Sequence, residues 1–176
     1  NMKMPEEVNR IVTDRIADLL LCPTQQAVAN LEDEGLKNGA AAIELCGDIM
    51  YDSLRMFSDL SAKKSRILET LNLHDDDFVL ATLHRQENTD NVSKLESIVA
   101  ALNELSISQR VVMPLHPRTK KMLTKYAITC TFDLIEPVGY LDMLALLKSC
   151  TLVVTDSGGL QKEAFFSEKN CVILRE

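Results

Sequence analysis

From about residue 77 onward, short apolar runs alternate with amphipathic segments. Each run is too short to be a helix, so the alternation predicts a parallel β-sheet with crossover helices. Between the first two runs, apolar residues recur at helical spacing after a candidate N-cap, Asp90 or Asn91, and Pro117 suits the first turn of the next helix. The predicted fold class is therefore α/β, with a Rossmann-like doubly wound parallel sheet. Strands are expected at 78–83, 111–115, 131–135, 152–155 and 171–174, and further helices at 141–148 and 160–167.

The first part of the chain has a different pattern, in which Pro5 opens an amphipathic helix. A domain boundary is expected near Gly47, which divides the chain into residues 1–47 and a second domain over 48–176. Both ends are expected to be truncated, since the chain begins directly before a helix and stops just after a strand. The other expected elements are strands at 19–22 and 42–46 and helices at 24–34, 49–60 and 62–71.

Composition narrows the range of partners. The formal net charge is −7 and the basic residues are scattered, so we do not expect a nucleic acid as a partner. The five cysteines are far apart with no C-x-x-C pair, a spacing that fits neither a zinc site nor a disulfide framework. Without an apolar run of membrane-spanning length, we expect no membrane insertion and a cytoplasmic location.

The strongest candidate for a ligand site is the segment Thr155-Asp156-Ser157-Gly158-Gly159, which follows an apolar strand and opens a helix. Ser157, Gly158 and Gly159 would let a phosphate approach free backbone N–H groups at the positive end of the helix dipole. Glu163, one turn further on, could accept hydrogen bonds from ribose hydroxyls. The alternative is a tight turn followed by a surface glutamate, because S-G-G is less specific than a Walker loop.

Two histidines emerge from neighbouring predicted strands. His84 follows the first apolar run and His116 follows the second, so each could serve as an acid, a base or a phosphate ligand near neutral pH. A histidine that only caps a strand end is the alternative for each, but two at equivalent positions favour a site. His74, in a polar loop, is expected to be a surface residue.

Two further groups are candidates on weaker grounds. Glu6 and Arg10 are four residues apart on the first predicted helix, where an ordinary ion pair is the simpler reading. The loop after the strand expected at 131–135 could frame a nucleotide base or be an ordinary turn. This loop comprises Glu136, Pro137, Val138, Gly139 and Tyr140.

Taken together, these motifs resemble the non-hydrolysing UDP-N-acetylglucosamine 2-epimerases, in the family's order and over nearly the whole chain. The motifs are Met4-Pro5-Glu6-Glu7-Val8-Asn9-Arg10, Cys22-Pro23-Thr24, Gly47-Asp48, His84-Arg85-Gln86-Glu87-Asn88, His116-Pro117, Glu136-Pro137-Val138-Gly139-Tyr140 and Thr155-Asp156-Ser157-Gly158-Gly159-Leu160-Gln161-Lys162-Glu163-Ala164.

The resemblance implies two Rossmann-like domains of the GT-B type, residues 1–47 being the remnant of the N-terminal one. It implies interconversion of UDP-GlcNAc and UDP-ManNAc, or of a close analogue, by anti elimination and syn re-addition of UDP, without metal or other cofactor, for cell-surface polysaccharide synthesis. A homodimer is expected for the full-length enzyme.

The resemblance also assigns roles residue by residue. Ser157, Gly158 and Gly159 would hold the diphosphate, Glu163 the ribose, and the 136–140 loop the uracil. His84 would lie against the phosphates and the sugar. Glu6 would be an acid/base carboxylate with Arg10 beside it, and His116 matches a histidine linked to a regulatory UDP-GlcNAc molecule in bacterial members.

Two departures from the family pattern matter. The family's N-terminal half is absent, so this chain alone should be inactive, and the His116 and Gln161 segments look more like relatives that epimerise UDP-2,3-diacetamido-2,3-dideoxyglucuronic acid. Two alternatives stay open at this point. One is a GT-B glycosyltransferase with a UDP-sugar donor. Those enzymes usually place two glutamates about a helix apart in the donor site, whereas here only Glu163 is so placed. The other is a non-catalytic nucleotide-binding module.

Overall fold

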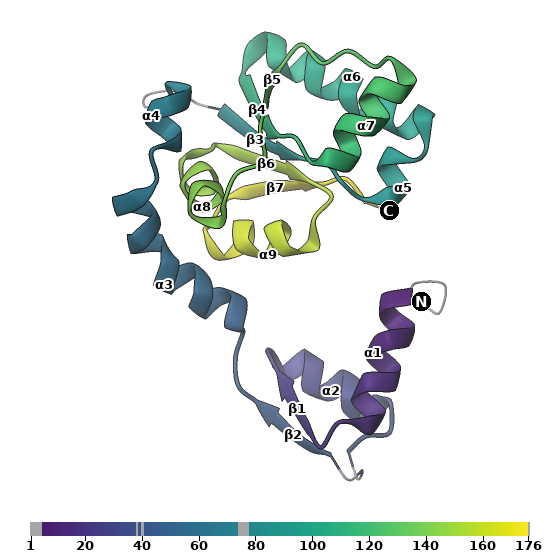
Figure 1. Cartoon of the computed structure of the whole chain (residues 1–176). Helices are drawn as coiled ribbons and strands as arrows, with labels where there is room; N and C mark the ends of the chain where they lie inside the picture. Colours follow the sequence, from purple (N-terminus) through teal and green to yellow (C-terminus); the bar gives the residue numbers. More distant parts are fainter. Residues whose placement is uncertain (1–4, 38, 40, 74–77, 176) are drawn as a thin grey trace. The chain divides into compact units, whose positions relative to one another are not determined.

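The computed structural model describes residues 5–37, 39, 41–73 and 78–175 (Figure 1). Contacts within the chain divide it into two compact units, residues 1–52 and 53–176. Each unit has its own strands and its own apolar core, so each is described by itself.

The second unit is built on a five-stranded parallel sheet with the order β5-β4-β3-β6-β7. The chain moves outward from the central strand β3 to β4 and β5, then returns to the other side of β3 for β6 and β7, as in a Rossmann half. The order therefore reverses between β3 and β6. The strands are β3 (Phe78–Thr82), β4 (Arg110–Pro114), β5 (Asp133–Ile135), β6 (Leu152–Thr155) and β7 (Asn170–Ile173).

Helices cover both faces of this sheet, which explains why the central strands are continuous apolar runs. One core packs Phe78 and Leu80 of β3 against helices α3, α4, α8 and α9, and the other packs Val79 and Ala81 against α6 and α7. Asn91 caps α6 through its side chain, and Pro117 occupies the first turn of α7. The helices are α3 (Ile49–Lys64), α4 (Ile67–Leu71), α5 (Gln86–Thr89), α6 (Val92–Ser108), α7 (Pro117–Tyr126), α8 (Tyr140–Ser149) and α9 (Gly158–Phe166).

The first unit pairs two parallel strands and packs them with α2, around Leu20, Cys22 and Leu31. Thr24 caps α2, since its hydroxyl accepts a hydrogen bond from the backbone N–H of Ala27 at 3.1 Å. The elements of this unit are α1 (Pro5–Ile16), β1 (Leu19–Cys22), α2 (Gln25–Asp33) and β2 (Ala42–Leu45).

The predicted elements are found within one or two residues at most ends, with two exceptions. The helix expected to end at Leu60 instead continues to Lys64, and only 67–71 forms a separate helix. The short helix α5 was not predicted, because its four residues lack an apolar period.

The unit boundary falls inside α3, between Asp52 and Ser53, whereas the sequence suggested Gly47. The assignment of residues 1–47 to a domain remnant stays a prediction.

None of the helices in the described ranges is both long and apolar enough to span a bilayer.

Candidate functional site

Polar loops follow the carboxyl ends of four strands of the second unit. His84 comes after β3, His116 after β4, the 136–139 loop after β5 and Ser157 after β6. Because all five strands are parallel, these loops share one edge of the sheet, and the predicted convergence of the strand ends is confirmed. β3 and β6 are neighbours at the point where the strand order reverses, which is where ligands bind in open α/β sheets.

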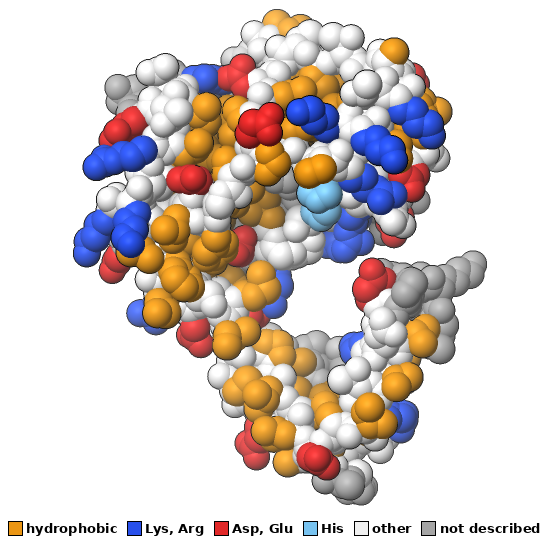
Figure 2. Space-filling model, viewed as in Figure 1, with side chains coloured by type: hydrophobic (Ala, Val, Ile, Leu, Met, Phe, Trp, Pro, Cys, Tyr) orange, Lys and Arg blue, Asp and Glu red, His pale blue; other side chains and the backbone are white. Residues whose placement is uncertain are grey.

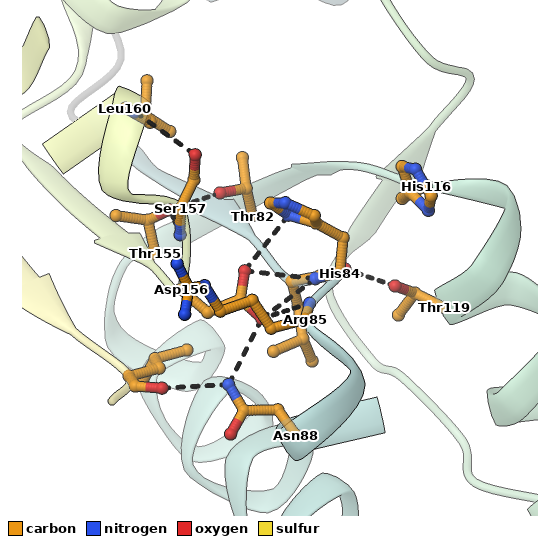
Figure 3. Close-up of polar contacts among 12 residues, drawn as sticks. Thr82, His84, Arg85, Asn88, His116, Thr119, Thr155, Asp156, Ser157 and Leu160 are labelled. Carbon is orange, nitrogen blue, oxygen red and sulfur yellow. Dashed lines mark hydrogen bonds and ion pairs between the residues drawn. The ribbon is translucent and has the colours of Figure 1, made fainter. Parts of the chain in front are cut away.

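Asp156 ties the β3 and β6 loops together, and its side chain is fully buried (Figure 3). Its Oδ2 accepts hydrogen bonds from the backbone N–H groups of His84 at 3.0 Å and Arg85 at 2.8 Å. The Nδ1 atom of His84 lies 3.1 Å from its Oδ1. A buried carboxylate needs such donors, because an unpaired charge in the interior is costly. Asp156 therefore fixes the backbone that presents His84.

Asn88 of α5 completes this arrangement. Its Nδ2 donates to Asp156 Oδ2 at 3.2 Å and to the backbone carbonyl of Leu174, after β7, at 2.9 Å. Neither Asp156 nor Asn88 had a role predicted from the sequence. The signal for Asp156 was present, since a carboxylate directly after a buried strand must find donors in the adjacent loops.

The two predicted histidines lie side by side. The ring centroids of His84 and His116 are 5.5 Å apart, and the planes are inclined by 37°. His116 also caps α7, because its Nδ1 accepts a hydrogen bond from the backbone N–H of Arg118 at 3.1 Å. Figure 2 shows Lys and Arg side chains beside the exposed histidine surface of this unit, so this edge suits an anionic ligand.

The Ser157 turn opens α9 in the geometry expected of an anion site. The Ser157 hydroxyl accepts a hydrogen bond from the backbone N–H of Leu160 at 3.3 Å and so acts as the N-cap. A methyl group added at Gly158 would lie 3.7 Å from the guanidinium of Arg175. Arg175 was not among the residues predicted from the sequence. The helix N-terminus and this guanidinium give the turn two sources of positive potential.

Glu163 lies on α9 and interacts with the hydroxyl of Tyr140, the first residue of α8. Burial raises the pKa of the Glu163 carboxyl, and the Tyr140 hydrogen bond opposes this shift. The Tyr140 ring packs edge-on against Phe57 of α3, with centroids 5.8 Å apart and planes at 86°.

Elsewhere in the predicted uracil loop, Val138 packs against the core, while the exposed Glu136 lies 3.7 Å from Lys120 Nζ.

Replacement of Glu163 by Gln is expected to stabilise the protein at neutral pH. Since burial raises the folded-state pKa of this carboxyl, its favourable contribution is present at low pH and is lost as the pH rises through that pKa. Thermal unfolding should give a higher Tm for Glu163→Gln than for wild type at pH 7 and no difference near about pH 4. The gain is modest because the side chain is only half-buried. Equal Tm values at pH 7 would contradict the burial argument, and Glu96→Gln on the exposed face of α6 is the control.

In the first unit, Arg10 is engaged by three carboxylates. It forms salt bridges with Glu7 at 2.9 Å, Asp14 at 2.6 Å and Glu34 at 2.7 Å, which join α1 to the end of α2. Its partners in the described ranges do not include Glu6, so the simple Glu6–Arg10 ion pair is not what the structure shows. Glu6 is exposed. Roles for Glu6 and Arg10 at a substrate stay predictions.

The described residues contain no group of three or more His, Cys, Asp or Glu side chains placed to hold a metal ion. His74, expected at the surface, and its loop 74–77 lie outside the described residues.

A doubly wound parallel sheet with a glycine-containing helix N-terminus at its switch point is the arrangement of a Rossmann-like α/β domain. The family model described as UDP-N-acetylglucosamine 2-epimerase matches residues 1–176. The chain belongs to this family. The match covers the segments that carried the resemblance in the sequence, and the predicted family is confirmed.

Individual relatives agree with the family match. The chain is 48% identical to the UDP-2,3-diacetamido-2,3-dideoxy-D-glucuronate 2-epimerase of Pseudomonas aeruginosa, over 100% of this chain and 49% of that protein. It is 44% identical to a UDP-N-acetylglucosamine 2-epimerase homolog of Methanococcus maripaludis, over 98% of this chain and 49% of that protein. The chain thus spans about half the length of the curated relatives it matches.

A solved relative shows the same fold. The structure of Methanocaldococcus jannaschii UDP-GlcNAc 2-epimerase in complex with UDP-GlcNAc and UDP matches with a TM-score of 0.88 at 36% identity, over 100% of this chain and 50% of that chain. The predicted fold class, α/β with parallel sheets of the GT-B type, is confirmed.

Proposed function

We propose that this chain is the nucleotide-binding part of a non-hydrolysing UDP-sugar 2-epimerase. In the proposed reaction, the C2 proton is removed and the C1–O bond breaks, which releases UDP and leaves a 2-acetamidoglucal. UDP then adds back at C1 while a proton returns to C2 from the other face. The supporting observation is the juxtaposition of His84 and the Ser157 turn through Asp156, in a chain of this family.

The Ser157 turn is suited to the departing diphosphate. Negative charge develops on the leaving oxygen as the C1–O bond breaks, and preoriented N–H groups with a nearby guanidinium stabilise such charge without reorganisation. Ser157, Gly158 and Gly159 would hold the diphosphate, with Arg175 beside Gly158 as an additional cation. His84 would act beside them on the phosphates and the sugar.

The remaining roles follow the resemblance. Glu163 would accept hydrogen bonds from the ribose, and its contact with Tyr140 connects it to the loop proposed for uracil. Glu6 would supply an acid/base carboxylate. Because carboxylates surround Arg10, we propose that it acts by holding α1 in place, with any substrate contact secondary. His116 would belong to a regulatory nucleotide-sugar site.

The substrate is proposed to be UDP-GlcNAc or the related diacetamido-glucuronate. The 48% identity to the Pseudomonas aeruginosa enzyme supports the second, and the Methanocaldococcus jannaschii complex supports a UDP-sugar in general. We further propose a cytoplasmic homodimer that serves the synthesis of cell-surface polysaccharides, as the family resemblance implies.

The test is to incubate the full gene product with each nucleotide sugar in D₂O, without any acceptor. The proposal predicts the C2 epimer with deuterium at C2, because the proposed elimination removes that proton. Consumption of the sugar nucleotide only when an acceptor is added would support the glycosyltransferase alternative instead. No turnover with or without an acceptor, despite UDP binding, would support the non-catalytic module.

A further inference from the structure

The contacts of Asp156 extend beyond the loop backbone to one particular atom of His84. Oδ1 of Asp156 lies 3.1 Å from His84 Nδ1 and also accepts from the His84 backbone N–H at 3.1 Å. Oδ2 accepts from the backbone N–H of Arg85 and from Asn88. Both oxygens of this fully buried carboxylate therefore accept from backbone N–H groups of one loop, and Oδ1 also faces the His84 ring nitrogen.

These contacts determine where the imidazole carries its proton. An ionised carboxylate can only accept hydrogen bonds, so the His84 nitrogen that faces it must be the N–H form. Nε2 is then the nitrogen available to a ligand, on a side chain that is 39% exposed. In the neutral ring Nε2 can accept a proton, and in the charged ring it can donate to a phosphate oxygen.

We propose that Asp156 is a positioning residue that holds the Nδ1–H tautomer of His84 and directs Nε2 toward the nucleotide-sugar. The backbone hydrogen bonds fix the loop, and the Nδ1 contact fixes the ring within it. The other tautomer would put a proton on Nε2 and remove the acceptor from the ligand side. The catalytic consequence rests on the proposed epimerase function, whereas the tautomer does not.

The test uses Asp156→Asn, which has nearly the same volume and can still accept from the loop N–H groups through its amide oxygen. Its NH₂ group would donate to Nδ1 and so reverse the tautomer. In a serine-protease triad the same substitution preserves the geometry but lowers kcat by about 10⁴-fold. We expect a loss of about 10²–10⁴-fold in kcat for the full gene product, the range of a general acid–base contribution, with a much smaller change in UDP affinity.

The decisive readout is the ¹⁵N NMR spectrum of His84 in this chain. Wild type should carry its proton on Nδ1 near neutral pH, and Asp156→Asn should move it to Nε2. Asn88→Ala is the matched control, because it removes hydrogen bonds to Asp156 and to the Leu174 carbonyl without touching Nδ1. The control should keep the wild-type tautomer and lose less activity.

Two results would overturn this proposal. A neutral Nε2–H tautomer in the wild-type spectrum would do so even if Asp156→Asn failed to fold. Equal losses of kcat in Asp156→Asn and Asn88→Ala, with the tautomer unchanged in both, would mean that Asp156 serves only the loop. A wild-type gene product that does not epimerise any UDP-sugar would remove the proposed function but leave the tautomer result standing.

Discussion

Ser157→Asp should abolish UDP binding while leaving the fold at least as stable as wild type. Ser157 caps α9 through its side-chain oxygen, and aspartate is an equally good N-cap. The new charge also interacts favourably with the helix dipole, so Tm should not fall. The same charge stands where the diphosphate is proposed to bind. Because like charges in contact cost several kcal/mol, the affinity for UDP should drop by about 100-fold or more.

The matched control for this variant is Asn91→Asp. Asn91 caps α6 in the same unit, and its side chain accepts a hydrogen bond from the backbone N–H of Lys94 at 3.1 Å. The control therefore adds the same charge at a second helix cap, and UDP should still raise its Tm as it does for wild type. A UDP-induced rise in Tm that is equal in wild type and Ser157→Asp would exclude the Ser157 turn as the diphosphate site.

Glu6→Gln in the full gene product should lower kcat by about 10²–10⁴-fold, the range of a general acid–base contribution. Its affinity for UDP should change little, because the proposed role of Glu6 concerns the sugar and not the nucleotide. Glu6 is exposed and does not take part in the salt bridges of Arg10, so its replacement should not disturb α1. Steady-state kinetics with UDP inhibition would separate the two effects.

Glu7→Gln is the control one position along α1. The Arg10 guanidinium lowers the pKa of Glu7 through a hydrogen bond, so this change weakens the contacts of Arg10 while removing the same charge from the helix. Its effect should fall on stability more than on turnover. Near-wild-type kcat for Glu6→Gln would show that Glu6 is an ordinary surface residue.

The sheet could be predicted from the sequence because its strands are buried on both faces. Such strands are continuous apolar runs, as in Phe78–Thr82 and Leu152–Thr155, where the only polar residue is the threonine at the end of each strand. The N-cap at Asn91 and the proline in the first turn of α7 follow local rules that hold without tertiary context. The length of α3 was harder to predict from the sequence. Residues 49–60 and 62–71 both have helical propensity, and only packing decides where the first helix ends.

The positions of the candidate site residues in the sequence were informative because parallel strands bring their carboxyl ends to one edge. His84 and Ser157 could be placed together by topology alone. Asp156, Asn88 and Arg175 could not, since their importance depends on which side chain turns inward and which loop supplies donors. For Arg10, the sequence showed a possible partner at Glu6, but the structure pairs it with Glu34 across 24 residues.

We propose that this unit binds the nucleotide of a UDP-sugar at the carboxyl ends of the neighbouring strands β3 and β6. Calorimetric titration of UDP into the 176-residue chain measures this binding. We expect weak, saturable binding to wild type, no measurable binding to Ser157→Asp, and no epimerisation of added UDP-sugar by the chain alone. Binding of UDP to both proteins with equal affinity, or to neither, would contradict the proposal.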